Sequence, residues 1–198
     1  AVTVICTDKT GTLTRNEMRV ADFRKPKEVD NVLLYRSIAI NSTASVEGDE
    51  VIGNPTEGAL LLWLRQQGVD YVALRSSAEV VQELPFSTEN KYMATVTREA
   101  GGKLSLFVKG APEIIGNYCD IPSEEQGLVS KYTEDCQNRG MRMLALAVKD
   151  LEAGEEAIAG GKLHVSGLRL IALFAISDPV REDVPGAVRE CLDAGIDV

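Results

Sequence analysis

The sequence predicts an α+β fold in which an antiparallel sheet with flanking helices is inserted into part of a second, α/β domain. In the middle of the chain, strand signals alternate with helix signals without a regular βαβ repeat, which indicates an antiparallel sheet. Residues 2–7 form an apolar, β-branched run that is typical of a strand buried in a parallel sheet. A helix is expected at residues 185–194. We therefore predict that residues 1–20 and 177–198 belong to one domain and that residues 21–176 form the other.

Helices in the central segment are predicted from apolar spacing and from residues that favour helix ends. Residues 28–40 carry apolar side chains at helical spacing. The string Asn54-Pro55-Thr56-Glu57 combines a capping Asn, a Pro at the first position and a Glu at the third, which predicts a helix start. Gly68 ends that helix. Two further helices are expected, a short one opened by Pro112 and a longer one capped by Ser123 with Gln126 and ended by Gly140.

Strands are predicted where β-branched and aromatic residues cluster between turn signals. In chain order these runs are residues 80–86, 92–98, 104–109, 143–148 and 168–176. The string Ala100-Gly101-Gly102-Lys103 separates the second run from the third and predicts a hairpin. A Gly- and Glu-rich stretch before the last run predicts a loop.

The composition limits the partners and the environment of the chain. Its 198 residues carry a net charge of −9, which argues against nucleic acid or an anionic membrane surface as a direct partner. The longest strongly apolar stretch, residues 168–176, is far shorter than the roughly 18–20 residues of a membrane span. The four cysteines show no metal-ligand spacing, so we expect free thiols in a reducing compartment. We expect a soluble monomer and assign no role to His164, the single histidine.

Asp8 follows the N-terminal apolar run and begins the string Asp8-Lys9-Thr10-Gly11-Thr12-Leu13-Thr14. Open α/β sheets place their chemistry where strands end. A carboxylate at such a position can attack a phosphoryl group and become an aspartyl phosphate. Lys9 would offset the negative charge, and Thr10 and Thr12 offer hydroxyl and N–H groups to phosphate oxygens. The alternative is a solvated Asp-Lys pair in an ordinary turn.

This string resembles the phosphorylation motif of P-type cation-transporting ATPases. The resemblance implies that residues 1–20 and 177–198 are parts of that family's haloacid-dehalogenase-like phosphorylation domain and that residues 21–176 are its nucleotide-binding domain. Many phosphatases of the superfamily carry a second Asp two residues after the nucleophile, where this chain has Thr10. Without that carboxylate to activate water, a phosphoenzyme should persist. This favours a pump over a soluble phosphatase, and the presence of Asp8 disfavours a free-standing nucleotide sensor.

Two further strings resemble motifs of the same ATPases. Lys109-Gly110-Ala111-Pro112-Glu113 is similar to their KGAPE signature, although by itself it is also typical of a plain strand-to-helix turn. Lysine at a strand end beside glycine suits a nucleotide phosphate or a purine. Phe86-Ser87, followed by Lys91 and Met93, is similar to the adenine-pocket segment of calcium and sodium pumps. The resemblance implies that Phe86 stacks on adenine, that Lys91 lies near the ring edge or the phosphates, and that Met93 fills the pocket wall.

Three positions allow more than one interpretation. Glu57 would close a capping box at its helix start, and the resemblance also implies an approach to the adenine amino group. Arg142 matches the family's phosphate-side arginine, and its alternative is a solvated residue at a strand end. Thr88 stands where the family has an arginine after Phe-Ser. The phosphate contact that this arginine makes in the family therefore has no matching residue here.

The resemblance implies a reaction, cofactors and a cellular setting. The γ-phosphoryl group of Mg·ATP would pass to Asp8, with Mg²⁺ held by Asp8 and the carbonyl of Thr10. Residues 41–44 and 52–57 look most like the calcium-pump branch, especially the plasma-membrane type, and Asp178-Pro179-Val180-Arg181 resembles the family's returning hinge. We therefore expect the cytoplasmic domain of an integral membrane protein whose membrane helices carry the cation, here calcium. The family's TGD and GDGxND motifs are absent from the sequence, so we expect the chain alone to be catalytically incomplete.

Overall fold

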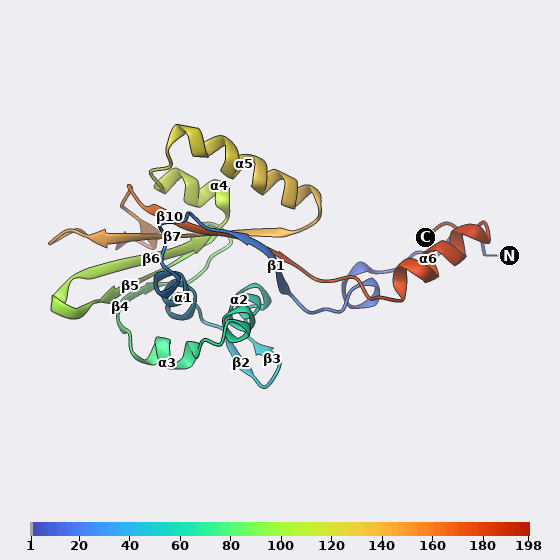
Figure 1. The fold of residues 1–198 in the computed structure, drawn as a ribbon, viewed down its shortest axis with the longest axis horizontal. Helices are drawn as coiled ribbons and strands as arrows, with labels where there is room; N and C mark the ends of the chain where they lie inside the picture. The colour runs from blue at the N-terminus through green and yellow to red at the C-terminus, as the bar shows by residue number, and fades with distance from the viewer. Residues whose placement is uncertain (1) are drawn as a thin grey trace.

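The computed structural model describes residues 2–198 and contains a six-stranded antiparallel sheet. Two groups of helices cover its faces, and both ends of the chain extend away from one side (Figure 1). The strands, in spatial order, are β1 (Arg19–Arg24), β10 (Arg169–Ser177), β7 (Arg142–Leu151), β6 (Leu104–Gly110), β5 (Tyr92–Arg98) and β4 (Glu79–Leu84). The predicted antiparallel sheet with flanking helices is therefore confirmed.

The helices divide the core into two parts, one on each face of the sheet. The first face packs on α1 (Asn31–Ile40), α2 (Pro55–Gln66) and α3 (Tyr71–Ser76). The second packs on α4 (Pro112–Ile115) and α5 (Ser123–Asn138). Because side chains alternate along a strand, neighbours such as Leu106 and Phe107 enter different cores. Both faces of β5, β6, β7 and β10 are consequently buried.

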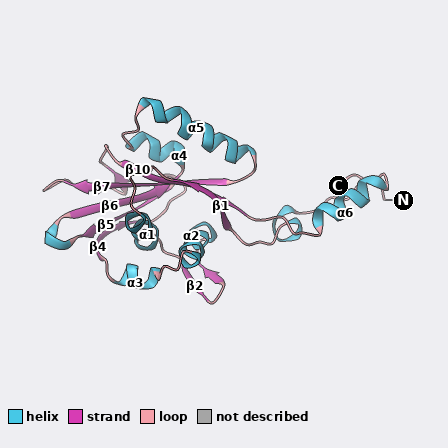
Figure 2. Cartoon of the chain, in the orientation of Figure 1, coloured by secondary structure: helices cyan, strands magenta, loops and turns pink. Residues whose placement is uncertain are grey.

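Smaller elements complete the central part (Figure 2). A hairpin formed by β2 (Ser45–Glu47) and β3 (Glu50–Ile52) follows α1 in the sequence. A second hairpin, formed by β8 (Ile158–Ala159) and β9 (Lys162–Leu163), comes after β7 and before β10 in the sequence. Single helical turns lie at Ala100–Gly102, inside the predicted β5–β6 hairpin, and at Gly116–Tyr118. These two hairpins, α3 and β1 are not among the elements predicted from the sequence.

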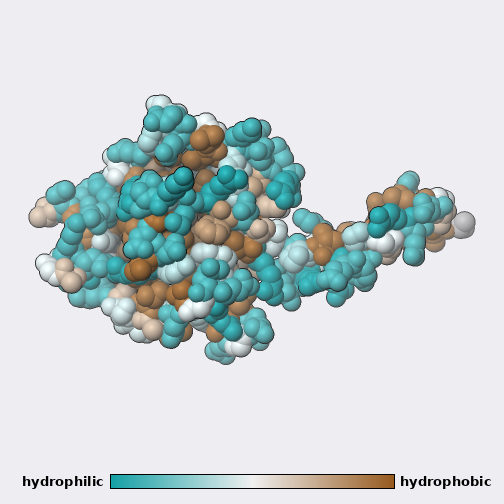
Figure 3. All heavy atoms as spheres, in the orientation of Figure 1, coloured by the Kyte–Doolittle hydropathy of each residue, from teal (hydrophilic) through white to brown (hydrophobic). Residues whose placement is uncertain are grey.

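The predicted N-terminal strand is wrong. Within the described residues, the run 2–7 forms one bridge, from Val4 to Asp197, and remains exposed, with Val2 at 64% and Val4 at 55% of full accessibility. A run becomes a buried parallel strand only when neighbouring strands and helices cover it. The predicted C-terminal helix is present as α6 (Val184–Asp193). The extension formed by these two ends carries apolar surface in Figure 3.

Two chain segments run side by side between the sheet and this extension. Arg15 N–H donates to the carbonyl of Pro179, and Arg181 N–H donates to that of Leu13, both at 3.0 Å. The carboxylate of Asp178 accepts from the hydroxyl of Thr14 and from the N–H of Glu17. The segment 178–181, which resembles the family's hinge, is therefore hydrogen-bonded to the segment that follows Asp8. The division into domains at residues 20 and 177 stays a prediction.

The expected cap of α5 is also wrong. The helix begins at Ser123, but Pro122 occupies the capping position and no side chain caps the helix there. Gln126 donates instead to the carbonyl of Ile121. Among the described residues, no helix has the length and apolar character that crossing a lipid bilayer requires.

Candidate functional site

Strand pairing joins the two segments that were predicted to surround a nucleotide. In the β5–β6 ladder, Met93 lies opposite Lys109 and Tyr92 lies opposite Gly110. A Cβ atom on Gly110 would lie 2.5 Å from the carbonyl oxygen of Lys91 and 2.7 Å from the Cβ of Tyr92. The position therefore admits only glycine without a shift of the backbone. Ala111 N–H then donates to that same Lys91 carbonyl at 3.1 Å.

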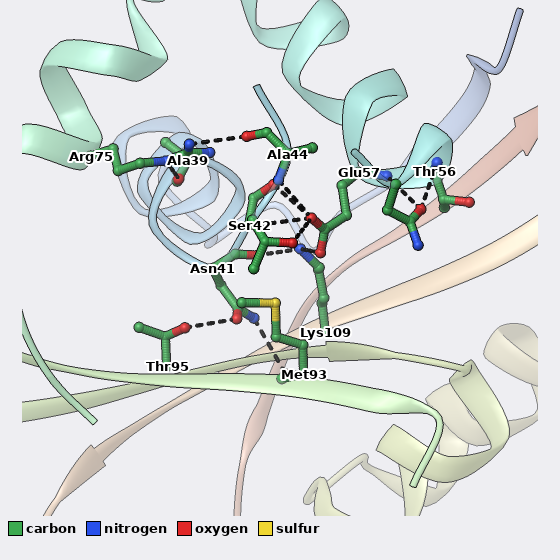
Figure 4. Close-up of polar contacts among 12 residues, drawn as sticks. Ala39, Asn41, Ser42, Ala44, Thr56, Glu57, Arg75, Met93, Thr95 and Lys109 are labelled. Carbon is green, nitrogen blue, oxygen red and sulfur yellow. Dashed lines mark hydrogen bonds and ion pairs between the residues drawn. The ribbon is translucent and has the colours of Figure 1, made fainter. Parts of the chain in front are cut away.

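Lys109 is buried in an ion pair. Its side chain is 5% exposed, and Nζ lies 2.7 Å from Oε1 of Glu57, whose side chain is 7% exposed. Nζ also donates to the main-chain carbonyl of Asn41 (Figure 4). Burial lowers the pKa of Lys109, and the negative charge of Glu57 opposes that shift. A charge at this depth is tolerated because an opposite charge and a carbonyl oxygen replace water around it.

Glu57 does not close the capping box that was predicted at the start of α2. Asn54 does cap α2, since its Oδ1 accepts from the N–H groups of Thr56 and Glu57. The Glu57 carboxylate, however, points away from the helix start and pairs with Lys109, so the predicted capping box does not form (Figure 4). Burial alone would raise the pKa of Glu57, but Lys109 and the hydrogen bonds from Thr43 outweigh it and hold that pKa below its usual value. Glu57 is therefore an anion at neutral pH.

The segment after α1 supplies the other partners of this carboxylate. Oε2 of Glu57 accepts from the N–H of Thr43 at 2.8 Å, the hydroxyl of Thr43 at 3.0 Å, the N–H of Ala44 at 3.0 Å and the hydroxyl of Ser42 at 3.2 Å. Residues 41–44 resemble the calcium-pump branch, but no role at the site was predicted for them from the sequence. The available signal was a short polar run directly after the apolar helix α1.

The remaining predicted nucleotide residues are Arg142, Phe86, Ser87 and Lys91. Arg142 begins β7 and donates to the hydroxyl of Thr56 at 2.6 Å, which places it beside the start of α2. Phe86 is 51% exposed, and Lys91 is also exposed. The Ser87 hydroxyl accepts from the N–H of Asn90, which holds the turn between β4 and β5.

This arrangement combines three features that a nucleotide requires. Phe86 offers an exposed aromatic face on which a base can stack. Lys91 and Arg142 are exposed cations suited to phosphate oxygens. The Glu57–Lys109 pair is a buried, oriented polar group, and Met93, which lies opposite Lys109 in the β5–β6 ladder, is fully buried. The contacts of Lys109 with Glu57 and of Arg142 with Thr56 thus join β6 and β7 to the start of α2.

The predicted phosphorylation residues lie elsewhere. Asp8, Lys9, Thr10 and Thr12 are exposed in and before the turn Lys9–Leu13, on the extension in Figure 1. Gly11 adopts a φ of 76° in that turn, and its N–H donates to the Thr14 hydroxyl. Asp8 and Thr10, the two residues predicted to hold Mg²⁺, are thus both exposed. In residues 2–198, no group of three or more His, Cys, Asp or Glu side chains is arranged to hold a metal ion.

Comparisons with known proteins agree with the family resemblance. Residues 29–183 match the family described as P-type ATPase, cytoplasmic domain N. The chain is 32% identical to a plasma membrane-type calcium-transporting ATPase 10 of Arabidopsis thaliana, and the match covers 100% of this chain and 22% of that protein. It is 32% identical to the cation-transporting ATPase pma1 of Synechocystis, covering 100% of this chain and 26% of the relative. It is 33% identical to plasma membrane calcium-transporting ATPase 1 of Mus musculus, covering 99% and 19%. The chain thus spans about a fifth to a quarter of these relatives.

Proposed function

The chain belongs to the family of P-type ATPase cytoplasmic N domains, and we propose that it binds ATP and carries the aspartate that a cation pump phosphorylates. The observation that carries this proposal is the set of contacts that joins the strands to the start of α2: the Lys109–Glu57 ion pair, the Arg142–Thr56 hydrogen bond and the β5–β6 pairing of Lys109 with Met93. The names of the relatives support calcium as the cation of the whole protein. The family description, cytoplasmic domain N, supports a position on the cytoplasmic side of a membrane.

Each side chain of the site has a proposed role in holding ATP. Phe86 stacks on adenine, Ser87 fixes the turn that presents it, and Met93 forms the wall. Gly110 and Ala111 let the backbone approach the nucleotide closely. Lys91 and Arg142 bind phosphate oxygens, and the Glu57–Lys109 pair faces the base.

The proposed chemistry occurs at Asp8. A carboxylate oxygen of Asp8 forms a bond to the γ-phosphorus while the bond to the bridging oxygen breaks and ADP leaves. Lys9, Thr10 and Thr12 hold the transferred oxygens. Mg²⁺, bound by Asp8 and the carbonyl of Thr10, would neutralise phosphate charge. Since Asp8 and the base-binding residues lie on different parts of the chain, we propose that the fastened segments around Thr14 and Asp178 bend to bring them together.

Phosphorylation can be tested by acid quenching of the whole protein after incubation with radiolabelled ATP and Mg²⁺. The unmodified protein should retain label, and Asp8→Asn should lose it, because the amide cannot form the acyl phosphate. We expect no label on the isolated 198-residue chain, since transfer depends on charge neutralisation that the chain supplies only in part. Label retained by whole-protein Asp8→Asn would refute the assignment of the nucleophile.

Binding of ATP to the chain can be tested by nuclear magnetic resonance titration. Replacing Phe86 with alanine should weaken binding by about 1–3 kcal/mol, because it removes a stacking face. Asp8→Asn should leave the affinity nearly unchanged or slightly higher, since it removes a repelling charge. We expect dissociation constants of roughly 0.1–1 mM for the unmodified chain. The opposite ranking of the two variants would contradict the placement of adenine at Phe86.

A further inference from the structure

The β8–β9 hairpin is hydrogen-bonded to the turn between β4 and β5 and to both strands that this turn connects. In the turn, the side-chain amide of Asn90 donates to the carbonyl of Gly161 at 2.9 Å. At the start of β5, the hydroxyl of Tyr92 accepts from the N–H of Leu163 at 3.0 Å. In β4, the side chain of Gln82 donates to a carbonyl of β8 at 3.1 Å. Three contacts between segments distant in the sequence therefore fasten the hairpin to this turn.

The last residue of the turn, Lys91, has an unusual backbone conformation. Its φ of 58° lies in the left-handed region, which few residues other than glycine adopt. Such a conformation persists only where the surrounding contacts fix it. The N–H of Lys91 donates to the carbonyl of Ser87 at 2.8 Å, and its own carbonyl accepts from Ala111 at the end of β6. The preceding residue, Asn90, is held by the hairpin, so the backbone at Lys91 is fixed from two sides.

The hairpin provides a fixed acceptor for Asn90. Its two-residue loop consists of Gly160 and Gly161, with φ values of 54° and 75°. Two successive residues with positive φ are typical of the tight turns that match the twist of paired strands. Ile158 and Leu163, on either side of the loop, are 4% and 6% exposed and belong to the core under α4 and α5. The Gly161 carbonyl therefore stands on a loop whose base is anchored in the core.

We propose that the β8–β9 hairpin positions the turn that presents Phe86 and Lys91 to the nucleotide, with Asn90 as the positioning residue. The apparent affinity of a site is proportional to the fraction of molecules in which its binding residues are correctly arranged. Without the bond to the hairpin, the left-handed conformation at Lys91 competes with more common ones, and this fraction falls. The hairpin acts in this way without touching the nucleotide. This inference rests on the proposed binding of ATP at Phe86 and Lys91.

The experiment removes the contact from each side and measures the affinity for ATP by nuclear magnetic resonance titration. Asn90→Ala deletes the amide donor and should weaken binding by about three- to tenfold, the effect of one hydrogen bond. Gly161→Ala places a side chain on a residue with a φ of 75°, which displaces the acceptor and should cause a similar loss. The double variant should bind no more weakly than either single variant, because both changes remove the same contact.

Gly154→Ala, in the loop between β7 and β8, is the matched control. Gly154 has a φ of 83°, and an added Cβ would meet no atom within 4 Å, as at Gly161. It should lower the midpoint of urea unfolding in the way that Gly161→Ala does, but leave the affinity for ATP unchanged. In the absence of nucleotide, the amide signal of Lys91 should shift in Asn90→Ala and Gly161→Ala and not in Gly154→Ala. A general loss of stability would not produce this pattern.

The contrary outcomes separate the inference from the proposed function. Unchanged affinity in Asn90→Ala and Gly161→Ala would show that the hairpin does not position the turn, while ATP binding would stand. Additive losses in the double variant would show that the two residues act through different contacts, which overturns the inference. An equal loss in Gly154→Ala would attribute the effect to stability alone. If the unmodified chain does not bind ATP, the proposed function is refuted and the inference with it.

Discussion

Replacing Lys109 with methionine should destabilise the chain by about 3–5 kcal/mol, because it leaves the Glu57 carboxylate buried without its opposite charge. Methionine is similar in length to lysine, so packing loss contributes little. The charge itself cannot relax into water, since the Glu57 side chain is only 7% exposed. Urea unfolding followed by circular dichroism measures the change as a lower midpoint with a similar slope.

Two further variants identify the cause of this loss. The double variant Glu57→Gln with Lys109→Met should be more stable than Lys109→Met alone, since Gln keeps an oxygen for the donors of residues 42–44 and removes the unpaired charge. Lys103→Met is the matched control, because Lys103 and its partner Asp150 are both largely exposed. That exposed pair should contribute at most about 1 kcal/mol. If Lys103→Met and Lys109→Met lower the free energy of unfolding equally, the loss at Lys109 does not come from leaving a buried charge unpaired.

The four inner strands of the central sheet could be predicted because they are largely apolar on both faces and follow or precede glycine-containing turns. Edge strand β1, Arg19–Arg24, was missed because most of its side chains are exposed, so its sequence shows neither a buried run nor a clear alternation. Residues 2–7 caused the opposite error. Their composition fits a buried strand, but composition cannot show whether neighbouring strands cover it.

The site could be predicted only where a residue acts through its own local motif. Gly110 and Lys109 were identified from one string, and the structure places them in the same β5–β6 pairing as Met93. The partners of Glu57 were not identified, because its contacts with Thr43 and Lys109 join segments that are distant in the sequence. The local capping signature of α2 therefore predicted the wrong partner for the carboxylate, although it predicted the start of the helix correctly.

Replacing Gly110 with alanine should destabilise the chain by about 3 kcal/mol, the upper end of the usual cost of overpacking. The new Cβ would lie 2.5 Å from the Lys91 carbonyl oxygen, and that contact is with backbone rather than with a flexible side chain. The carbonyl cannot move without disturbing the hydrogen bond that it accepts from Ala111. Strands β5 and β6 must therefore separate locally, which also shifts Lys109 relative to Glu57.

The control for this variant is Gly127→Ala in the second turn of α5, where an added Cβ meets no atom within 4 Å. Alanine should stabilise that helix by about 0.5–1 kcal/mol, because it restricts the unfolded chain and favours helical backbone. Urea unfolding should therefore move the two midpoints in opposite directions. If Gly110→Ala also binds ATP more weakly, the close approach at Gly110 serves the nucleotide site as well as the sheet. A stability equal to that of the unmodified chain would show that the β5–β6 pairing yields more easily than these distances indicate.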